Sequence, residues 1–207
     1  MNIEMTYPFM IRCAIPEVEK KSCPSSLPVA SNLLWDSIFR AHRDVLDGRF
    51  YLPVYCSTME NGNPKRQRGE YYQINRVAVA LYNILSEATE RISPRDIINR
   101  FHTEDFVGIE FGAVQKLVNM TFKYLYILKL YNVDEESINN ILFSIEDCDC
   151  PLDSRILQHT ESYQDILWTH IDSATYQAVQ EEIDRIGEGE PRLMFDFVNY
   201  QQLDFHE

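Results

Sequence analysis

One segment, residues 113–131, constrains the fold of this 207-residue chain more than any other. It reads Ala-Val-Gln-Lys-Leu-Val-Asn-Met-Thr-Phe-Lys-Tyr-Leu-Tyr-Ile-Leu-Lys-Leu-Tyr, which is apolar on nearly every side of a helix. A helix that is apolar all round is stable in water only when other elements cover it. The segment therefore predicts a helix buried in the core.

Patterns typical of helices surround this segment and define the fold class. Apolar residues at helical spacing, together with N-cap residues, predict helices near 32–46, 71–91, 94–101, 135–144, 153–158 and 173–186. Both ends contain segments that look extended: 6–15 as a short strand, and 193–200 as a strand or a docked extended segment. Residues 50–56 also look extended. We therefore predict a mainly α protein with minor β at the termini. An irregular segment, 1–60, would pack on a helical core domain, 61–207, within one compact domain.

Charge is distributed unevenly along the chain. Residues 1–129 contain 16 Lys and Arg against 14 Asp and Glu, whereas residues 130–207 contain 3 against 18. Neutralisation of phosphates supplies much of the affinity for DNA, so the C-terminal part disfavours a nucleic-acid interface. Two interpretations of this part stay open: a solvated acidic face, or a surface that binds a basic partner.

The sequence also predicts a compartment and excludes some cofactors. No apolar run approaches the ~20 residues of a membrane span, and no signal-peptide pattern begins the chain. The 5 cysteines are odd in number and irregularly spaced, which favours reduced thiols in the cytoplasm. Cys148 and Cys150, with His159 and His170, are spaced poorly for zinc, so we predict neither a metal nor a cofactor.

Three polar residues interrupt the core helix at positions that share one face. Lys116, Asn119 and Lys123 are spaced i, i+3, i+7. A lysine in a poorly solvated site loses stabilisation of its charge, and its neutral amine then becomes available as a nucleophile. The alternative is that these lysines extend along the helix to place their ammonium groups in water.

The order of features between residues 94 and 157 points to a family. A short helix leads into a turn that contains Gly108 and Gly112, and the core helix then opens with Gln115 and Lys116. A Pro-Leu-Asp segment that ends at Asp153 follows later. This order resembles the helix-hairpin-helix DNA glycosylases, the superfamily of endonuclease III and the 8-oxoguanine glycosylases. The two glycines are four residues apart, which departs from the usual hairpin of that family.

The resemblance implies roles for individual residues. Lys116 would attack the sugar C1′ and form a Schiff base, and Asp153 would stabilise the developing positive charge. The target base would be flipped out of the duplex. Residues implied to contact DNA are Gly108, Gly112, Gln115, Asn119 and Lys123, together with the basic loop Lys65, Arg66 and Arg68. Asp153 also has a purely structural interpretation, because an aspartate at a helix start is a normal N-cap.

Three functions therefore remain open at the level of sequence. The order of motifs favours the first of them, on a helical domain with a helix-hairpin-helix-like core. A DNA glycosylase-like protein would carry a positive groove over Lys116. A non-catalytic acidic interaction protein, such as an adaptor or a defence-related component, would tie Lys116 to a carboxylate and have no pocket there. A small-molecule or nucleotide-binding module would enclose Lys116, Asn119 and Lys123 in a closed pocket.

Overall fold

The computed structural model describes residues 33–45, 69–101, 109–130 and 136–201. Every regular element in these ranges is a helix, so the prediction of a mainly α protein is confirmed. The elements are α2 (Leu33–Val45), α3 (Gly69–Ser86), α4 (Pro94–Arg100), α5 (Phe111–Leu130), α6 (Glu136–Asn139), η3 (Ile145–Asp147), α7 (Ser154–Leu157), η4 (Trp168–His170), α8 (Ser173–Ile186) and α9 (Arg192–Gln201).

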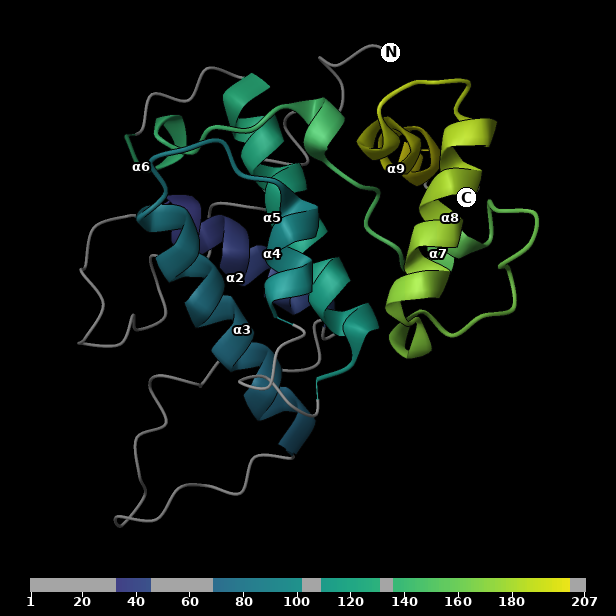
Figure 1. Ribbon diagram of the computed structural model, residues 1–207, viewed down its shortest axis with the longest axis horizontal. Coiled ribbons are helices and arrows are strands. Elements are labelled where there is room, and N and C mark those ends of the chain that lie inside the picture. The colour runs from purple at the N-terminus through teal and green to yellow at the C-terminus, as the bar shows by residue number, and fades with distance from the viewer. Residues whose placement is uncertain (1–32, 46–68, 102–108, 131–135, 202–207) are drawn as a thin grey trace.

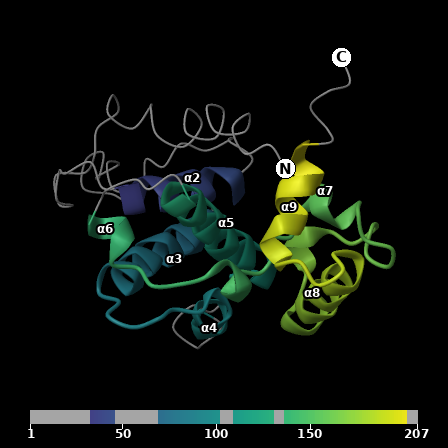
Figure 2. The same cartoon turned by 90° about the horizontal axis from the view of Figure 1, so that it is seen from above.

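Helix α5 is the centre of the molecule, as its sequence predicts. Of its 20 residues, 16 are buried. Its most extensive contact is with α2, and α3 and α4 also pack on it (Figure 2). Large side chains of these helices, such as Leu34, Leu81 and Phe122, are fully buried. The apolar sides of α5 thus form the core of the N-terminal half of the fold.

Helices α7, α8 and α9 lie together on the opposite side of α5 (Figure 1). The chain reaches them through η3 and the extended segment 148–152, whose residues are all buried. A buried connection has to satisfy its backbone hydrogen bonds inside the protein, because water does not reach it. The side chains that do so come from α5 and α8 and form part of the site described below.

Several local predictions are confirmed by the structure. Helix α8 has the predicted bounds and ends at Gly187. Ser93 caps α4, with Pro94 at its first position, and Asp153 caps α7. The helix predicted near 135–144 is shorter, because only Glu136–Asn139 is α-helical there.

The extended conformation predicted for residues 193–200 is wrong, because this segment is helix α9. Leu193, Asp196 and Phe197 are spaced i, i+3, i+4 and are all buried, so a helix places them on one inward face. The aromatic and β-branched residues of the segment favoured a strand, but packing against α5 overrides that preference. The strand predicted at 6–15, the extended segment predicted at 50–56, the boundary at residue 60 and the hairpin preceding α5 lie outside the described residues. Within the described part of the chain, no helix is long and apolar enough to cross a bilayer.

Candidate functional site

The polar residues of α5 form one stripe that meets the C-terminal half. Gln115, Lys116, Asn119 and Lys123 are all buried. Each contacts a residue from the segment after α6: Leu152, Asp153, Tyr176 and Asp196, respectively. The polar stripe formed by these four residues of α5 thus docks α7, α8 and α9.

Lys116 and Asp153, the predicted catalytic pair, lie together. The Lys116 Nζ is 3.4 Å from Asp153 Oδ2, and Lys116 is only 5% exposed. The ammonium also lies 4.5 Å from the centre of the Trp168 ring, a cation–π arrangement. The other oxygen of Asp153 accepts hydrogen bonds from the N–H groups of Arg155 and Ile156, at 3.0 and 3.1 Å. Asp153 therefore both caps α7 and neutralises the lysine.

Lys123 and Asp196 form a second ion pair, about two helical turns after Lys116 along the stripe. Both residues are buried, and the ammonium lies 5.3 Å from the centre of the Phe197 ring. Burial raises the pKa of Asp196 above its ordinary value, whereas the charge of Lys123 acts in the opposite direction. This pair joins α5 to α9.

Two glutamine side chains clamp the buried connection on either side of Pro151. The amide of Gln115 donates to the carbonyl of Leu152 at 2.7 Å and accepts from its N–H at 3.1 Å. The amide of Gln180 forms the matching pair with Cys150, at 2.7 and 3.1 Å. Each amide satisfies one backbone donor and one acceptor, so the segment can be buried between α5 and α8 without an unpaired group at these positions.

A chain of hydrogen bonds leads from α5 to a cluster of charges. Asn119 Nδ2 donates to the hydroxyl of Tyr176 at 2.9 Å, and that hydroxyl donates to Asp149 at 2.7 Å. Asp149 also accepts from Arg95, at 3.2 and 2.7 Å, and from Arg192 at 2.6 Å. Burial is the largest cause of a pKa of Tyr176 well above its ordinary value, so the hydroxyl keeps its proton.

Gly112 lies where α5 meets η4, and its missing side chain permits the contact. A Cβ atom at this position would be 2.0 Å from the carbonyl oxygen of Trp168 and 2.9 Å from the Cα of Thr169. Both of these are backbone atoms, which cannot rotate away. The glycine thus brings η4, and with it the Trp168 ring, close to α5.

The space beside the predicted catalytic pair is small. The cavity lined by Asp153, His159, Asp196 and neighbouring residues has a volume of about 10 Å³, which is room for about one water molecule. The two lysine ammonium groups lie inside the interface between the halves, each against a carboxylate and an aromatic ring.

The structure thus brings together Gly112, Gln115, Lys116, Asn119 and Lys123 along α5, with Asp153 opposite Lys116. Gly108, Lys65, Arg66 and Arg68 lie outside the described residues.

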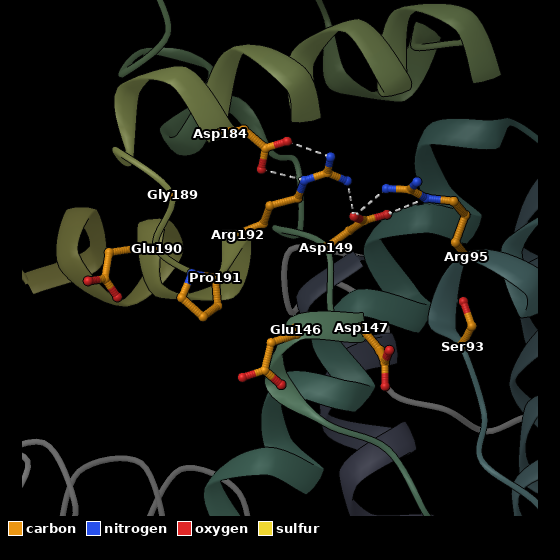
Figure 3. A pocket seen from close by; sticks show the side chains of 10 residues that line it. All are labelled: Ser93, Arg95, Glu146, Asp147, Asp149, Asp184, Gly189, Glu190, Pro191 and Arg192. Atoms are coloured by element: carbon orange, nitrogen blue, oxygen red, sulfur yellow. Dashed lines mark hydrogen bonds and ion pairs between the residues drawn. The ribbon is translucent and has the colours of Figure 1, made fainter.

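The larger opening lies elsewhere, between η3, the start of α4 and the turn that joins α8 to α9 (Figure 3). Its volume is about 440 Å³. We call it the η3–α9 cleft. Its lining residues are Ser93, Arg95, Glu146, Asp147, Asp149, Asp184, Gly189, Glu190, Pro191 and Arg192.

Sequence reasoning did not single out the residues that complete this region. Asp149 lies in the segment 147–151, whose sequence, Asp-Cys-Asp-Cys-Pro, predicts only a break between helices. Tyr176 and Gln180 are spaced i, i+4 on the apolar stripe of α8, beside Val179 and Ile183. Polar residues on such a stripe signal buried hydrogen bonds, but not their partners.

The cysteines in the described part of the chain are structural. Cys148 and Cys150 are both buried and free. Burial raises the pKa of the Cys148 thiol to about 12 and that of Cys150 well above its ordinary value. Among the described residues, no three His, Cys, Asp or Glu side chains are arranged to hold a metal ion.

Comparison with known proteins adds no relative: no protein-family model, curated protein or solved structure matches this chain.

Proposed function

We propose that this protein is a non-catalytic helical interaction protein whose acidic C-terminal part binds a basic protein partner. The observation that carries the proposal is the division of the charges between residues 136 and 201. This stretch contains 14 Asp and Glu but only 3 Arg and no Lys. The buried and half-buried carboxylates differ in role from the exposed ones.

The six acidic side chains that are buried or half-buried all belong to internal ion pairs. They are Asp147, Asp149, Asp153, Glu182, Asp184 and Asp196. Burial of an unpaired carboxylate is costly, so these six are accounted for by the stability of the fold. None of these six carboxylates therefore requires a positive charge from another protein.

The other eight acidic side chains are exposed, and none forms a salt bridge within the described ranges, although Asp172 caps α8 by accepting from the N–H of Thr175. They are Glu136, Glu146, Glu161, Asp165, Asp172, Glu181, Glu188 and Glu190. The exposed basic residues of the same stretch are Arg155 and Arg185. A surface with charge of one sign attracts partners of the opposite sign and repels nucleic acid phosphates.

The arrangement of Lys116 supports a non-catalytic role. An amine attacks a carbon only when it is neutral and can reach the substrate. Here Lys116 is 5% exposed and is paired with Asp153, and the cavity lined by Asp153 has a volume of only about 10 Å³. The contact with a carboxylate and the confined space match the expectation for an interaction protein.

A titration with a basic peptide tests the proposal. A fluorescein-labelled peptide of alternating arginine and serine is mixed with the full chain, and fluorescence anisotropy is followed at low and high salt. We expect binding that weakens as salt rises, and no binding of a matched glutamate–serine peptide. Absence of binding to the arginine peptide at low salt would refute the proposal.

One observation favours a second candidate, DNA glycosylase-like chemistry. Lys116 and Asp153, separated by 37 positions in the sequence, come within 3.4 Å of each other. Borohydride trapping on a duplex with an abasic site separates the two candidates. A Lys116→Arg variant keeps the ion pair with Asp153 but cannot form a Schiff base. An adduct in the wild type that is lost in this variant would establish the enzyme, and no adduct would favour the interaction protein.

A further inference from the structure

The geometry points to the η3–α9 cleft as the place where a lysine or arginine side chain of the basic partner is held. This inference rests on the proposed function and adds a location and a kind of contact. The cleft has a volume of about 440 Å³, large enough for the end of one long side chain with its flanking backbone. Its lining contains five acidic side chains and two basic ones.

The two arginines of the cleft are already occupied by internal partners. Figure 3 shows Arg192 between Asp184 and Asp149, while Arg95 reaches Asp149 from the other side. Arg192 donates two hydrogen bonds to Asp184, at 2.7 and 2.6 Å, and a third to Asp149. Arg95 donates two to Asp149. These guanidinium groups fix the wall of the cleft and are neutralised there, so they do not make it a site for an anion.

In Figure 3, Glu146 and Asp147 are drawn below this network, and Glu190 is drawn to its left, beyond Pro191. Glu146 and Glu190 are exposed and form no salt bridge within the described residues, although Glu146 has a side-chain hydrogen bond with Ser144. Asp147, by contrast, pairs with Arg91 at 2.7 Å. Glu146 comes from η3 and Glu190 from the turn after α8, so the two carboxylates approach the cleft from different elements. A cation inside the cleft would meet negative charge on two sides.

The backbone of the turn holds Glu190 at the edge of the cleft. Glu188 and Gly189 have φ values of 52° and 87°, and Gly189 is one of the lining residues. A positive φ reverses the chain over few residues and is most readily adopted by glycine. The N–H of Glu190 also donates to the carbonyl of Gly187 at 3.0 Å. The turn is therefore built from defined backbone hydrogen bonds, which set the position from which the Glu190 side chain extends.

These contacts indicate which kind of chemical group binds in the cleft. Asp149 and Asp184 neutralise the charges of Arg95 and Arg192, which weakens their attraction for an anion, and the described carboxylates are not grouped for a metal ion. An ammonium or guanidinium on a flexible stem suits a polar cleft with charges on separate walls, since it donates several hydrogen bonds at once. The group that binds is thus a basic side chain of a peptide segment.

A pair of matched double variants tests the location. Glu146→Gln with Glu190→Gln removes two charges from the cleft, and Glu161→Gln with Asp165→Asn removes two exposed charges that do not line it. All four side chains are exposed, so both proteins should keep the wild-type helical content and unfolding midpoint. The labelled arginine–serine peptide is titrated into each by fluorescence anisotropy.

We expect the dissociation constant to rise about tenfold in the cleft variant, the effect of losing two partly exposed charge pairs, and less than about twofold in the control. In a nitrogen-15 correlation spectrum of the wild type, the peptide should shift the amide signal of Gly189 and leave that of buried Gly112 in place. Equal losses in the two double variants, or an unmoved Gly189 signal, would overturn this inference while leaving the proposed function intact. A peptide that fails to bind the wild type would refute the proposed function itself.

Discussion

The change Lys123→Met tests whether the polar stripe of α5 holds the two halves of the fold together. Methionine has a length similar to that of lysine and fills the same space, but it removes the ammonium that faces Asp196. Lys123 is 3% exposed and Asp196 is 5% exposed, so the carboxylate would remain in the core without a counter-charge. Removal of one partner of a buried ion pair costs about 3–5 kcal/mol. A whole domain is stable by only about 5–15 kcal/mol.

The double change Lys123→Met with Asp196→Leu is the matched control. Replacement of both charges by apolar side chains is often neutral or stabilising, because the cost of burying the charges is removed with them. We therefore expect the double variant to unfold at a urea concentration close to that of the wild type. A second control is Lys129→Met on the same helix, at a half-buried lysine outside the stripe, which should cost much less. Circular dichroism at the helical band follows unfolding in each case.

The effect should also depend on pH, with a defined sign. Burial raises the pKa of Asp196 in the folded protein, so the folded state holds this proton more tightly than the unfolded state does. The contribution of this carboxyl to stability is then complete below its unfolded pKa of about 3.9 and is lost as pH rises through the folded value. Without Lys123, the charge of that lysine no longer opposes the rise in the pKa of Asp196 that burial causes. The difference in stability between wild type and Lys123→Met should therefore shrink as pH falls from neutrality.

Two results would refute this reasoning. A loss below about 1 kcal/mol for Lys123→Met at neutral pH is the size of an exposed pair and would mean that water reaches the carboxylate. A double variant as unstable as the single one would mean that the lysine acts through packing and not through its charge. Either result would remove the ion pair as the link between α5 and α9.

Three further outcomes follow from the same interface. Gly112→Ala places a Cβ 2.0 Å from the carbonyl oxygen of Trp168, so we expect a loss of about 1–3 kcal/mol and a changed tryptophan emission; wild-type stability would show that η4 moves freely. Gln115→Leu leaves the buried N–H and carbonyl of Leu152 without their partner and should cost about 2–4 kcal/mol in urea unfolding, whereas Gln115→Glu should retain the bond to the N–H only. The Cys148 thiol, whose pKa burial raises to about 12, should resist iodoacetamide at pH 8 until the protein is unfolded, as read by peptide mass spectrometry; rapid labelling of the folded chain would contradict its burial.

The elements that sequence reasoning placed correctly are those whose signals are local. The burial of α5 follows from a composition that is apolar on all sides, and Asp153 caps α7 through its own next two residues. The shared face of Lys116, Asn119 and Lys123 is likewise a matter of helical spacing alone. Such features depend on a few neighbouring residues, which the sequence gives directly.

What could not be predicted depends on residues far apart in the chain. Lys123 meets an aspartate 73 positions later, and this contact needs α9 to be helical, whereas the local composition favoured a strand. The η3–α9 cleft combines residues from 93 to 192, and none of them carries a recognisable motif. Lysines on a core helix are equally consistent with catalysis and with docking, because the pattern does not say what lies opposite.

The glutamine clamps on either side of Pro151 have a consequence for how the chain folds. Gln115 belongs to one half and Gln180 to the other, yet both complete the backbone hydrogen bonds of the same buried segment. A half-formed molecule would leave one amide without its partner next to apolar surface, which is unfavourable. The two halves therefore reach their full stability only when both are docked, and the unfolding of either one removes the support of the other.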